Sequence, residues 1–359
     1  MFWFNIFSRR ILKWYIRIPF FIFKTWMNPK IAEKMQLPPR HEDTKHHKEF
    51  NVYYLSLARL CAFVPLWQKK IDFQGIISPY LKLYSVICLI FLSVTLSGQI
   101  KGFNKVKWDH EKLAPGLIWK SSHTLLEDTI PQNINVLVVN LQKRKISILY
   151  NPKENIRTSK QGSEAKALAA VNAGFFNIKD GGSATYIKTQ GRIIDIDTAK
   201  KWPKNINMTG SVLIDTEGHL SISGSMLNSW YDSHPEFPEV LVTGPLLLRD
   251  KKKNLLPKTS LVITKHPRSS IGVINKHKVV LITLDGRTAD SRGMTLLQLT
   301  DLMISLGCKD AVNLDGGGST TMWINGKPFN GVVNMPCDNK KFDHEGERAV
   351  SDIIIIKEP

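Results

Sequence analysis

The sequence predicts an α+β protein with mixed β-sheets, short packing helices and a single main domain at residues 108–358. Two observations predict this class. Short apolar runs rich in β-branched residues outnumber the helical patterns, and no segment repeats at a period of 20–50 residues. A chain of 359 residues is long enough for one large domain or two of medium size.

The main domain begins with strand patterns. Residues 136–140 and 146–150 are apolar runs separated by a polar turn, which predicts a strand pair. Residues 162–168 predict a short helix, and the run at residues 169–171 predicts the strand that it leads into.

The middle of the domain continues the same alternation. Residues 211–215 and 220–223 flank Glu217 and Gly218, and this pattern predicts a hairpin. Residues 279–284 form an apolar run rich in β-branched side chains, which predicts a fully buried strand.

The clearest helix is predicted at residues 295–306. Leucine and methionine recur there at the i, i+3, i+4 and i+7 positions that face a core. Gly307 follows where a left-handed C-terminal cap is expected. Asn325-Gly326 is typical of a type I′ hairpin turn. Further strands are predicted at residues 311–314, 322–324 and 352–356.

The positive charge of the chain is concentrated near its start. Lys and Arg exceed Asp and Glu by 14 − 5 = +9 in residues 1–100 and by 35 − 26 = +9 in the rest, which gives the net +18. Residues 83–96 are apolar and uncharged, and small residues follow them. Basic charge ahead of an apolar segment is typical of a signal peptide or a membrane anchor with its N-terminus in the cytoplasm.

We therefore predict three parts. Residues 1–80 form a basic, aromatic extension, residues 81–99 a signal peptide or membrane anchor, and residues 108–358 an extracytoplasmic domain. Alternatively, translation begins near Tyr80 and the extension is not made. A nucleic-acid partner is not expected, because the charge is not spread over the domain and no aromatic-basic stripe is found.

Common catalytic and metal motifs are absent. The sequence contains no G-K-[ST], G-x-S-x-G, H-E-x-x-H or C-x-x-C pattern. No cofactor is required. A divalent cation near Asp285 or Asp315 has no ligand spacing to support it, so we predict no metal site. Cys308 and Cys337 either pair outside the cytoplasm or remain two buried thiols.

Polar side chains follow three predicted strands directly, and a glycine lies beside each of them. These side chains are Asn172, Asp285 and Asp315. Binding groups often gather on loops that a rigid sheet holds in place. The glycines at 316–318 are the most informative case, because such a run is kept where the backbone turns sharply or approaches a ligand closely. A plain glycine-rich hairpin is the alternative.

Two arginines extend this set. Arg268 and Arg287 each lie near a strand end, and a guanidinium group is a rigid fork that fits phosphate or carboxylate. Glu347 and Arg348 precede the last strand, and we predict that they form a structural pair that fixes the end of the chain.

Seven segments, in a fixed order, resemble the phosphodiester glycosidase family. They read VNAGFF (171–176), LVTGPLL (241–247), RSSIG (268–272), LDGR (284–287), GMT (293–295), NLDGGGSTTM (313–322) and ERAVSD (347–352). The resemblance covers roughly residues 108–358. It implies a hydrolase that cleaves a sugar, such as N-acetylglucosamine, from a sugar-1-phosphodiester, with a glycan or cell-envelope phosphodiester as the substrate.

The resemblance also implies a pocket. Its catalytic residues would be Asp315, Asp285, Arg268 and Arg287, and its substrate-binding residues would be Asn172, Gly316, Gly317, Gly318, Ser319 and Thr320. Either arginine would hold the phosphodiester, and either carboxylate would act on water or on the sugar. The alternative is a non-catalytic envelope module that binds glycan phosphates. Two carboxylates beside a phosphate favour the enzyme, since a pure anion binder gains nothing from them.

Overall fold

A computed structural model describes residue 103 and residues 106–126, 129–152, 154–179, 181–194 and 206–359. The extension predicted at residues 1–80 and the apolar segment at 83–96 lie outside the described residues. Within the described ranges, no helix is both long and apolar enough to span a membrane.

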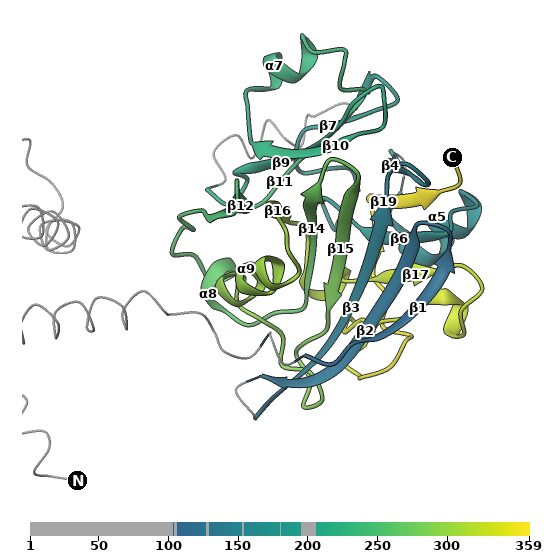
Figure 1. Ribbon diagram of the computed structural model, residues 1–359, viewed down its shortest axis with the longest axis vertical. Coiled ribbons are helices and arrows are strands. Elements are labelled where there is room, and N and C mark those ends of the chain that lie inside the picture. The colour runs from purple at the N-terminus through teal and green to yellow at the C-terminus, as the bar shows by residue number, and fades with distance from the viewer. Residues whose placement is uncertain (1–102, 104–105, 127–128, 153, 180, 195–205) are drawn as a thin grey trace, which may run out of the picture. The chain divides into compact units, whose positions relative to one another are not determined.

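Sheets dominate the described part of the chain (Figure 1). The eight-stranded sheet has the order β1 (Asp109–Ala114), β2 (Leu117–Leu126), β3 (Ile130–Asn140), β15 (Lys278–Leu284), β14 (Arg268–Asn275), β16 (Asp310–Asn313), β12 (Leu246–Arg249) and β13 (Lys252–Lys253). The five-stranded sheet has the order β10 (Leu220–Gly224), β9 (Gly210–Ile214), β11 (Glu239–Thr243), β7 (Ile187–Thr189) and β8 (Arg192–Ile193).

A four-stranded sheet forms the third large unit. Its order is β17 (Met322–Ile324), β6 (Ala169–Asn172), β19 (Asp352–Lys357) and β4 (Lys145–Tyr150). The short strands β18 (Ala349–Val350) and β5 (Ile156–Arg157) pair with each other; β5 follows β4 in the sequence and β18 precedes β19. The predicted combination of dominant sheets with short helices is confirmed. The sheets are not mixed, however, because every strand ladder in the described residues is antiparallel.

The helices are short. They are α5 (Thr158–Glu164), α7 (Asn228–Asp232), α8 (Ser260–Ile263) and α9 (Leu296–Ser305), with 3₁₀ turns η2 (Gly317–Ser319) and η3 (Phe329–Gly331). The helix predicted at 295–306 is α9. Thr295 caps it through a capping box with Gln298, and Gly307 has the expected left-handed φ of 84°. The helix predicted at 162–168 exists as α5 but begins four residues earlier.

Two other local predictions are wrong. The patterns at 136–140 and 146–150 are strands, but β3 pairs with β2 and β15 whereas β4 pairs with β19, so the turn between them connects two sheets. Asn325-Gly326 is not a type I′ turn, because only Gly326 has a positive φ. The hairpin of β9 and β10 and the buried strand β15 form as predicted.

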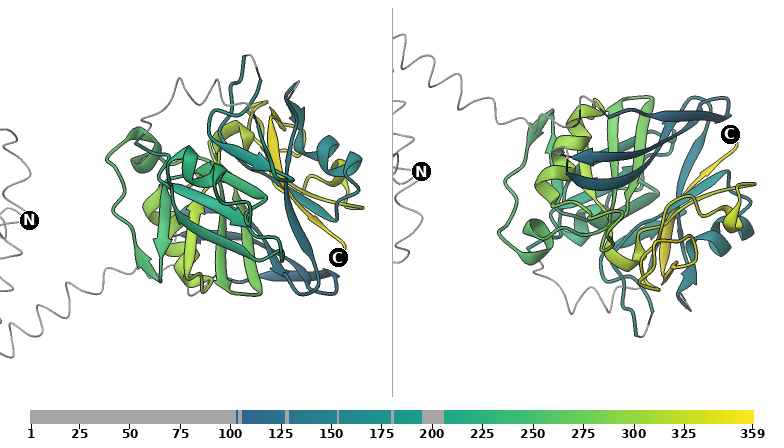
Figure 2. Two further views of the ribbon diagram at one scale, coloured as in Figure 1. Left: turned by 90° about the horizontal axis from the view of Figure 1, so that it is seen from above. Right: turned by 90° about the horizontal axis from the view of Figure 1, so that it is seen from below.

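Three apolar clusters hold the layers together. The inter-sheet core lies between the eight-stranded sheet and the two smaller sheets, and includes Leu281 from β15, Val171 from β6 and Ile354 from β19. A second cluster packs α9 on the outer face of the eight-stranded sheet, and a third packs around Trp323 and α5. Figure 1 and the right view of Figure 2 show α9 lying against that sheet.

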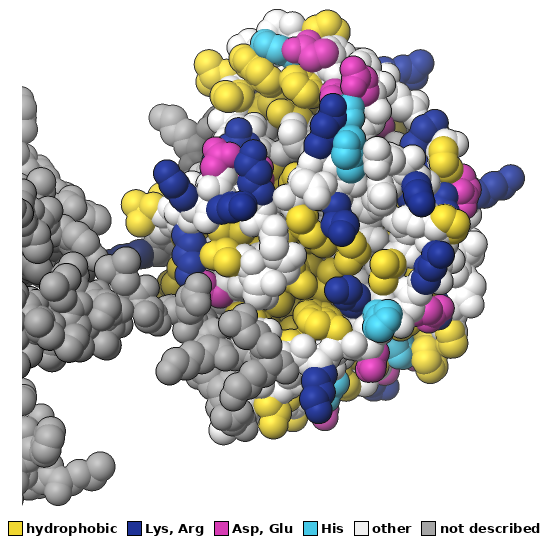
Figure 3. Space-filling model, viewed as in Figure 1, with side chains coloured by type: hydrophobic (Ala, Val, Ile, Leu, Met, Phe, Trp, Pro, Cys, Tyr) yellow, Lys and Arg dark blue, Asp and Glu magenta, His cyan; other side chains and the backbone are white. Residues whose placement is uncertain are grey.

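The five-stranded sheet has an aromatic cluster of its own around α7. Tyr186 and Tyr231 are buried there, and the ring of Trp230 stacks on His234. Met226 and Leu227 next to α7 are exposed, and hydrophobic side chains gather at that end of the molecule in Figure 3. Elsewhere in the domain, Cys308 and Cys337 are buried free thiols.

Candidate active site

The glycine run connects two different sheets. It begins after β16 of the eight-stranded sheet and ends before β17 of the four-stranded sheet. The alternative of a plain hairpin is therefore excluded, because β16 and β17 do not pair. Asp315 N donates to Ala173 O at 2.8 Å and Gly317 N donates to Pro267 O at 3.0 Å, so the segment lies between the ends of β6 and β14.

Asn172 fixes the position of this segment. Its Nδ2 donates to the Asp315 carbonyl at 2.7 Å. Its Oδ1 accepts from Ser269 Oγ at 2.6 Å and from Thr321 N at 3.1 Å. The side chain is 0% exposed. Asn172 therefore joins β6, β14 and the glycine segment, and it is a buried support of the site.

Two guanidinium groups lie against the glycine run. A Cβ on Gly317 would lie 2.9 Å from Arg287 Nη2, and a Cβ on Gly318 would overlap the guanidinium of Arg348. Gly317 also has a left-handed φ of 63°. A side chain at Gly317 or Gly318 would therefore displace the guanidinium group of Arg287 or Arg348 from its position against the backbone.

The two arginines differ in their partners. Arg348 pairs with Asp338, with Nε donating to Oδ1 at 3.1 Å. Arg287 is exposed, has a left-handed φ of 67°, and forms no ion pair with any described carboxylate. Its Nη2 lies 3.4 Å from His266 Nδ1. Burial lowers the pKa of His266, with Arg268 and Arg287 adding to the effect, so a neutral imidazole accepts this hydrogen bond.

Asp315 is the more open of the two predicted carboxylates. It is partly exposed and accepts from Gly316 N at 2.9 Å. Burial raises the pKa of Asp315 to about 6. Ser319 lies beside the carboxylate and opposes this rise, although its hydroxyl is not aligned for a well-formed hydrogen bond. A carboxyl group with a pKa near neutrality suits proton transfer or the support of positive charge.

Asp285 is enclosed and saturated with donors. It is 1% exposed and accepts from Asn133 Nδ2 at 2.7 Å, Asn334 Nδ2 at 2.8 Å and Met335 N at 3.0 Å. Burial raises the pKa of Asp285, and these three donors oppose the rise. The contacts make Asp285 an anchor for the segment at Asn334, which in turn donates to Thr320 O at 3.0 Å.

Arg268 is also committed to the fold. Its Nε donates to Met294 O at 2.9 Å, and its Nη2 donates to Leu261 O and Thr264 O, both at 2.7 Å. It is 1% exposed, and burial together with Arg287 lowers its pKa to about 10. The guanidinium groups that lie against the glycine run are instead those of Arg287 and Arg348.

The hydroxyl groups after the glycine run have no well-formed hydrogen bond within the described structure. Ser319 Oγ, Thr320 Oγ1 and Thr321 Oγ1 are buried and form no hydrogen bond within the described structure. An unpaired buried hydroxyl is uncommon and costs roughly 1–3 kcal/mol. Three in succession next to Asp315 leave hydrogen-bonding capacity in the glycine segment that the protein itself does not use.

The residues predicted from the sequence thus meet in one place. Asn172, Asp315 and the glycine run are in direct contact, Arg287 lies against Gly317, and Asp285 reaches Thr320 through Asn334. The sequence reasoning missed Arg348. Glu347 and Arg348 do not pair with each other as predicted, because Glu347 accepts from Ser159 N at 2.7 Å while Arg348 turns to Asp338.

His266 and Asn334 were also missed. Each is linked to a predicted residue, His266 to Arg287 and Asn334 to Asp285. No local motif marks either position, so only the fold reveals them. Among the described residues, no three His, Cys, Asp or Glu side chains gather into a metal-binding group.

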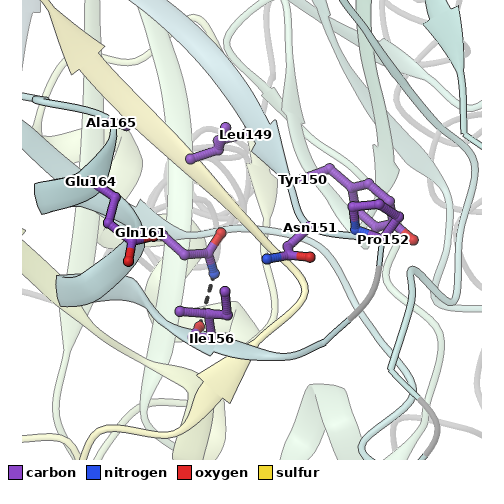
Figure 4. Close-up of a pocket in the computed structure, with 8 residues that line it drawn as sticks. All are labelled: Leu149, Tyr150, Asn151, Pro152, Ile156, Gln161, Glu164 and Ala165. Atoms are coloured by element: carbon purple, nitrogen blue, oxygen red, sulfur yellow. Dashed lines mark hydrogen bonds between the residues drawn. The ribbon is translucent and has the colours of Figure 1, made fainter.

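A cavity of about 460 Å³ lies apart from these residues, between the end of β4, β5 and α5 (Figure 4). Its lining includes Leu149, Tyr150 and Gln161, and Gln161 Nε2 donates to Ile156 O at 2.8 Å. None of the site residues described above lines it, so the chemistry of the glycine segment is not located there.

Known proteins are similar to this chain. SPbeta prophage-derived uncharacterized protein YomE of Bacillus subtilis is 36% identical over 122 residues, which cover 32% of this chain and 17% of that protein. N-acetylglucosamine-1-phosphodiester alpha-N-acetylglucosaminidase of Bos taurus is 31% identical over 93 residues, which cover 26% of this chain and 17% of that enzyme. The matches thus span about a sixth of the length of these curated relatives.

Solved structures share the fold. The catalytic domain of zebrafish N-acetylglucosamine-1-phosphodiester alpha-N-acetylglucosaminidase, auto-inhibited by its pro-peptide, aligns with a TM-score of 0.55 at 20% identity. The alignment covers 71% of this chain and 89% of that one. A hypothetical protein from Synechocystis aligns with a TM-score of 0.51 at 13% identity, covering 70% of this chain and 63% of that one.

The family assignment comes from the sequence. The description of the matching family is phosphodiester glycosidase, and the match spans residues 165–357, more than half of the 359-residue chain. This range contains the glycine run, both flanking arginines and the two predicted carboxylates. The protein therefore belongs to the phosphodiester glycosidase family.

Proposed function

We propose that this protein is an exported hydrolase that releases a sugar, of the N-acetylglucosamine type, from a sugar-1-phosphodiester in a glycan or the cell envelope. The observation that carries the proposal is the pair of guanidinium groups, Arg287 and Arg348, packed on the glycine run beside the partly exposed Asp315. The names of the curated animal relatives support the substrate class.

The arginines suit the phosphate group. A guanidinium fork matches the geometry of phosphate oxygens, and hydrogen bonds between charged groups are roughly twice as strong as neutral ones. Arg287 has no carboxylate partner among the described residues, so its charge is available to a ligand. Arg348 is held in place by Asp338. Together they would bind the phosphodiester and stabilise the charge that builds up on the leaving phosphate.

Asp315 suits the sugar side of the reaction. A water oxygen forms a bond to C1 of the sugar, the C1–O bond breaks, and the phosphomonoester leaves with the bonding electrons. Asp315 takes the proton of the attacking water or supports the positive charge at C1. A phosphomonoester is a good leaving group, so a second carboxyl acid is not needed, in contrast to ordinary glycosidases. The saturated contacts of Asp285 agree with this single-carboxylate scheme.

The decisive experiment uses the full chain and a panel of diesters in which N-acetylglucosamine, glucose or mannose is linked through C1 to an alkyl phosphate. We expect free sugar from at least one diester. Asp315→Asn should lower kcat/KM by about 100-fold or more, as expected for removal of a group that transfers protons. Asp290→Asn is the matched control, because Asp290 is exposed on the neighbouring loop.

The non-catalytic alternative makes a different prediction. A module that only binds glycan phosphates would bind the diesters in a calorimeter and release no sugar from any of them. Binding without turnover across the panel would overturn the enzyme proposal and favour the module.

A further inference from the structure

Three consecutive residues after β17 have left-handed backbones. They are Phe329, Asn330 and Gly331, with φ values of 55°, 55° and 84°. This region is costly for a bulky side chain, and such strain, of roughly 1–3 kcal/mol, gathers at functional sites. Phe329 gains little from burial in return, because 64% of it is exposed. The fold therefore keeps the Phe329 ring exposed although both its left-handed backbone and its contact with water are unfavourable.

The interior fixes this turn. Trp323 is 4% exposed, and its Nε1 donates to Asn330 O at 2.8 Å. A Cβ on Gly331 would overlap the Trp323 ring, so only glycine fits there. Gly331 N also donates to Pro328 O at 3.0 Å. The orientation of Phe329 is thus set by a buried side chain rather than by its own contacts with solvent.

One face of the Phe329 ring is covered by a histidine. The ring of His344 stacks on it with centroids 4.2 Å apart and an interplanar angle of 14°. His344 Nδ1 donates to Asn334 O at 2.8 Å, which fixes the imidazole. Asn334 in turn donates to Asp285 Oδ1 at 2.8 Å and to Thr320 O at 3.0 Å. The stacked pair is therefore linked to the candidate site through a single residue.

We propose that the Phe329–His344 pair is a platform for the acceptor sugar, the pyranose ring on the phosphate side of the scissile bond. This inference rests on the proposed function. The C–H face of a pyranose is apolar and covers the open face of an aromatic ring, which removes both surfaces from water.

The position of the platform selects the acceptor sugar over the released one. The released sugar must bring C1 to Asp315, beside the buried Ser319 and Thr320. Phe329 is open to solvent and His344 partly so, and the pair is connected to the site through the buried Asn334. An open rim suits the part of the substrate that continues into a larger glycan.

The test compares two diesters that share the same released sugar. One carries methyl hexoside 6-phosphate as the leaving group, and the other carries methyl phosphate. For Phe329→Ala, we expect KM for the hexoside diester to rise about tenfold, equivalent to about 1.4 kcal/mol, with kcat within about twofold. KM for the methyl diester should not change. Phe329→Tyr should retain the wild-type KM, and Leu255→Ala, at another exposed apolar side chain, is the control.

Two kinetic results for Phe329→Ala would contradict the platform. One is an equal rise of KM for both diesters, which would indicate a structural role, and the other is an unchanged KM for both. If the wild-type protein hydrolyses neither diester, the proposed function fails, and binding decides about the platform. Saturation-transfer NMR with methyl hexoside 6-phosphate should then show contact in the wild type and lose it in Phe329→Ala. No contact in the wild type, or a Phe329-dependent dimer in sedimentation, overturns the inference.

Discussion

Asp315 and Asp285 both lie just after a buried strand, and their hydrogen bonds and exposure separate their roles. Asp285 accepts three N–H donors and supports the segment at Asn334, whereas Asp315 accepts one and stays partly open. The sequence presents the two identically, as an aspartate before a glycine after an apolar run. Only the count of donors around each of them shows which is free to act on a substrate.

The pKa of Asp315 predicts an acidic limb in the pH profile. Burial raises this pKa to about 6, so the carboxylate is protonated as the pH falls through about 6 and can no longer accept a proton. We expect kcat to fall about tenfold per pH unit below that value. The measurement is kcat between pH 4.5 and 8 in buffers of equal ionic strength. A profile that stays flat down to pH 5 would contradict the assignment of Asp315 as the ionised group.

The raised pKa of Asp315 also makes the free energy of unfolding depend on pH. The folded-state pKa of about 6 exceeds the unfolded value of roughly 3.9, so the folded state holds a proton that the unfolded state has lost. The contribution of Asp315 to the free energy of unfolding is therefore full at low pH and is lost as the pH rises through about 6. At neutral pH the Asp315 carboxylate is ionised and this contribution to stability is absent.

Arg348 should matter as much as Arg287. Arg348→Gln removes a charge-assisted contact to phosphate worth about 1.5–3 kcal/mol, so kcat/KM should fall roughly 10- to 100-fold. Arg292→Gln is the matched control, since Arg292 is exposed on the loop after Asp285. Inhibition by the phosphomonoester product gives a second readout, and its Ki should rise in parallel. An unchanged Ki in Arg348→Gln would place the phosphate elsewhere.

Site residues could be predicted from the sequence where they directly follow an apolar strand pattern. Asn172, Asp315 and the glycine run are recognisable because each stands directly after an apolar run. Arg348 could not be placed, since its partner Asp338 and its neighbour Gly318 come from separate loops. Arg268 carries a side chain that suits phosphate, yet its guanidinium donates to three backbone carbonyl groups. The fold brings these carbonyls together, and no local sequence pattern reveals them.

At the scale of elements, the glycine segment is a crossing between sheets. Its backbone must pass two guanidinium groups, which explains the absence of side chains at Gly317 and Gly318. The strands before and after it were predictable from their apolar runs, but the sheets to which they belong were not. The same holds for β3 and β4, because pairing between distant segments is not encoded in either one alone.

Gly318→Ala tests this crossing. The added methyl group would displace the guanidinium of Arg348 and the carboxylate of Asp338, both at the ends of flexible side chains. We expect kcat/KM to fall about tenfold with a change in unfolding free energy of less than about 1 kcal/mol. Activity assays and urea titration measure the two quantities. Gly224→Ala is the control, because a methyl group there meets no atom within 4 Å. A large stability loss with unchanged activity would show that the glycine serves only the fold.

At the scale of the whole molecule, half of the net positive charge and the uncharged apolar run at residues 83–96 both precede the described domain in the sequence. We propose that residues 83–96 direct the domain out of the cytoplasm. Alkaline phosphatase, which is active only after export, fused behind residue 107 should be active in a bacterial host. Leu89→Arg should reduce that activity, since an arginine in the centre of an apolar segment costs roughly 2.5–3.5 kcal/mol on insertion. Equal phosphatase activity in the two fusions would contradict a role for this segment.

The stacking of the sheets has a consequence for substrate selection. Arg287 follows β15 of the eight-stranded sheet, whereas Arg348 precedes β18 and β19, and the inter-sheet core lies between β15 and β19. The two arginines are thus attached to the two sheets that pack on the inter-sheet core, while their guanidinium groups lie against the neighbouring residues Gly317 and Gly318. A change in the packing of that core, at Leu281 or Ile354 for example, would therefore shift one guanidinium group relative to the other while every residue that touches the ligand stays the same.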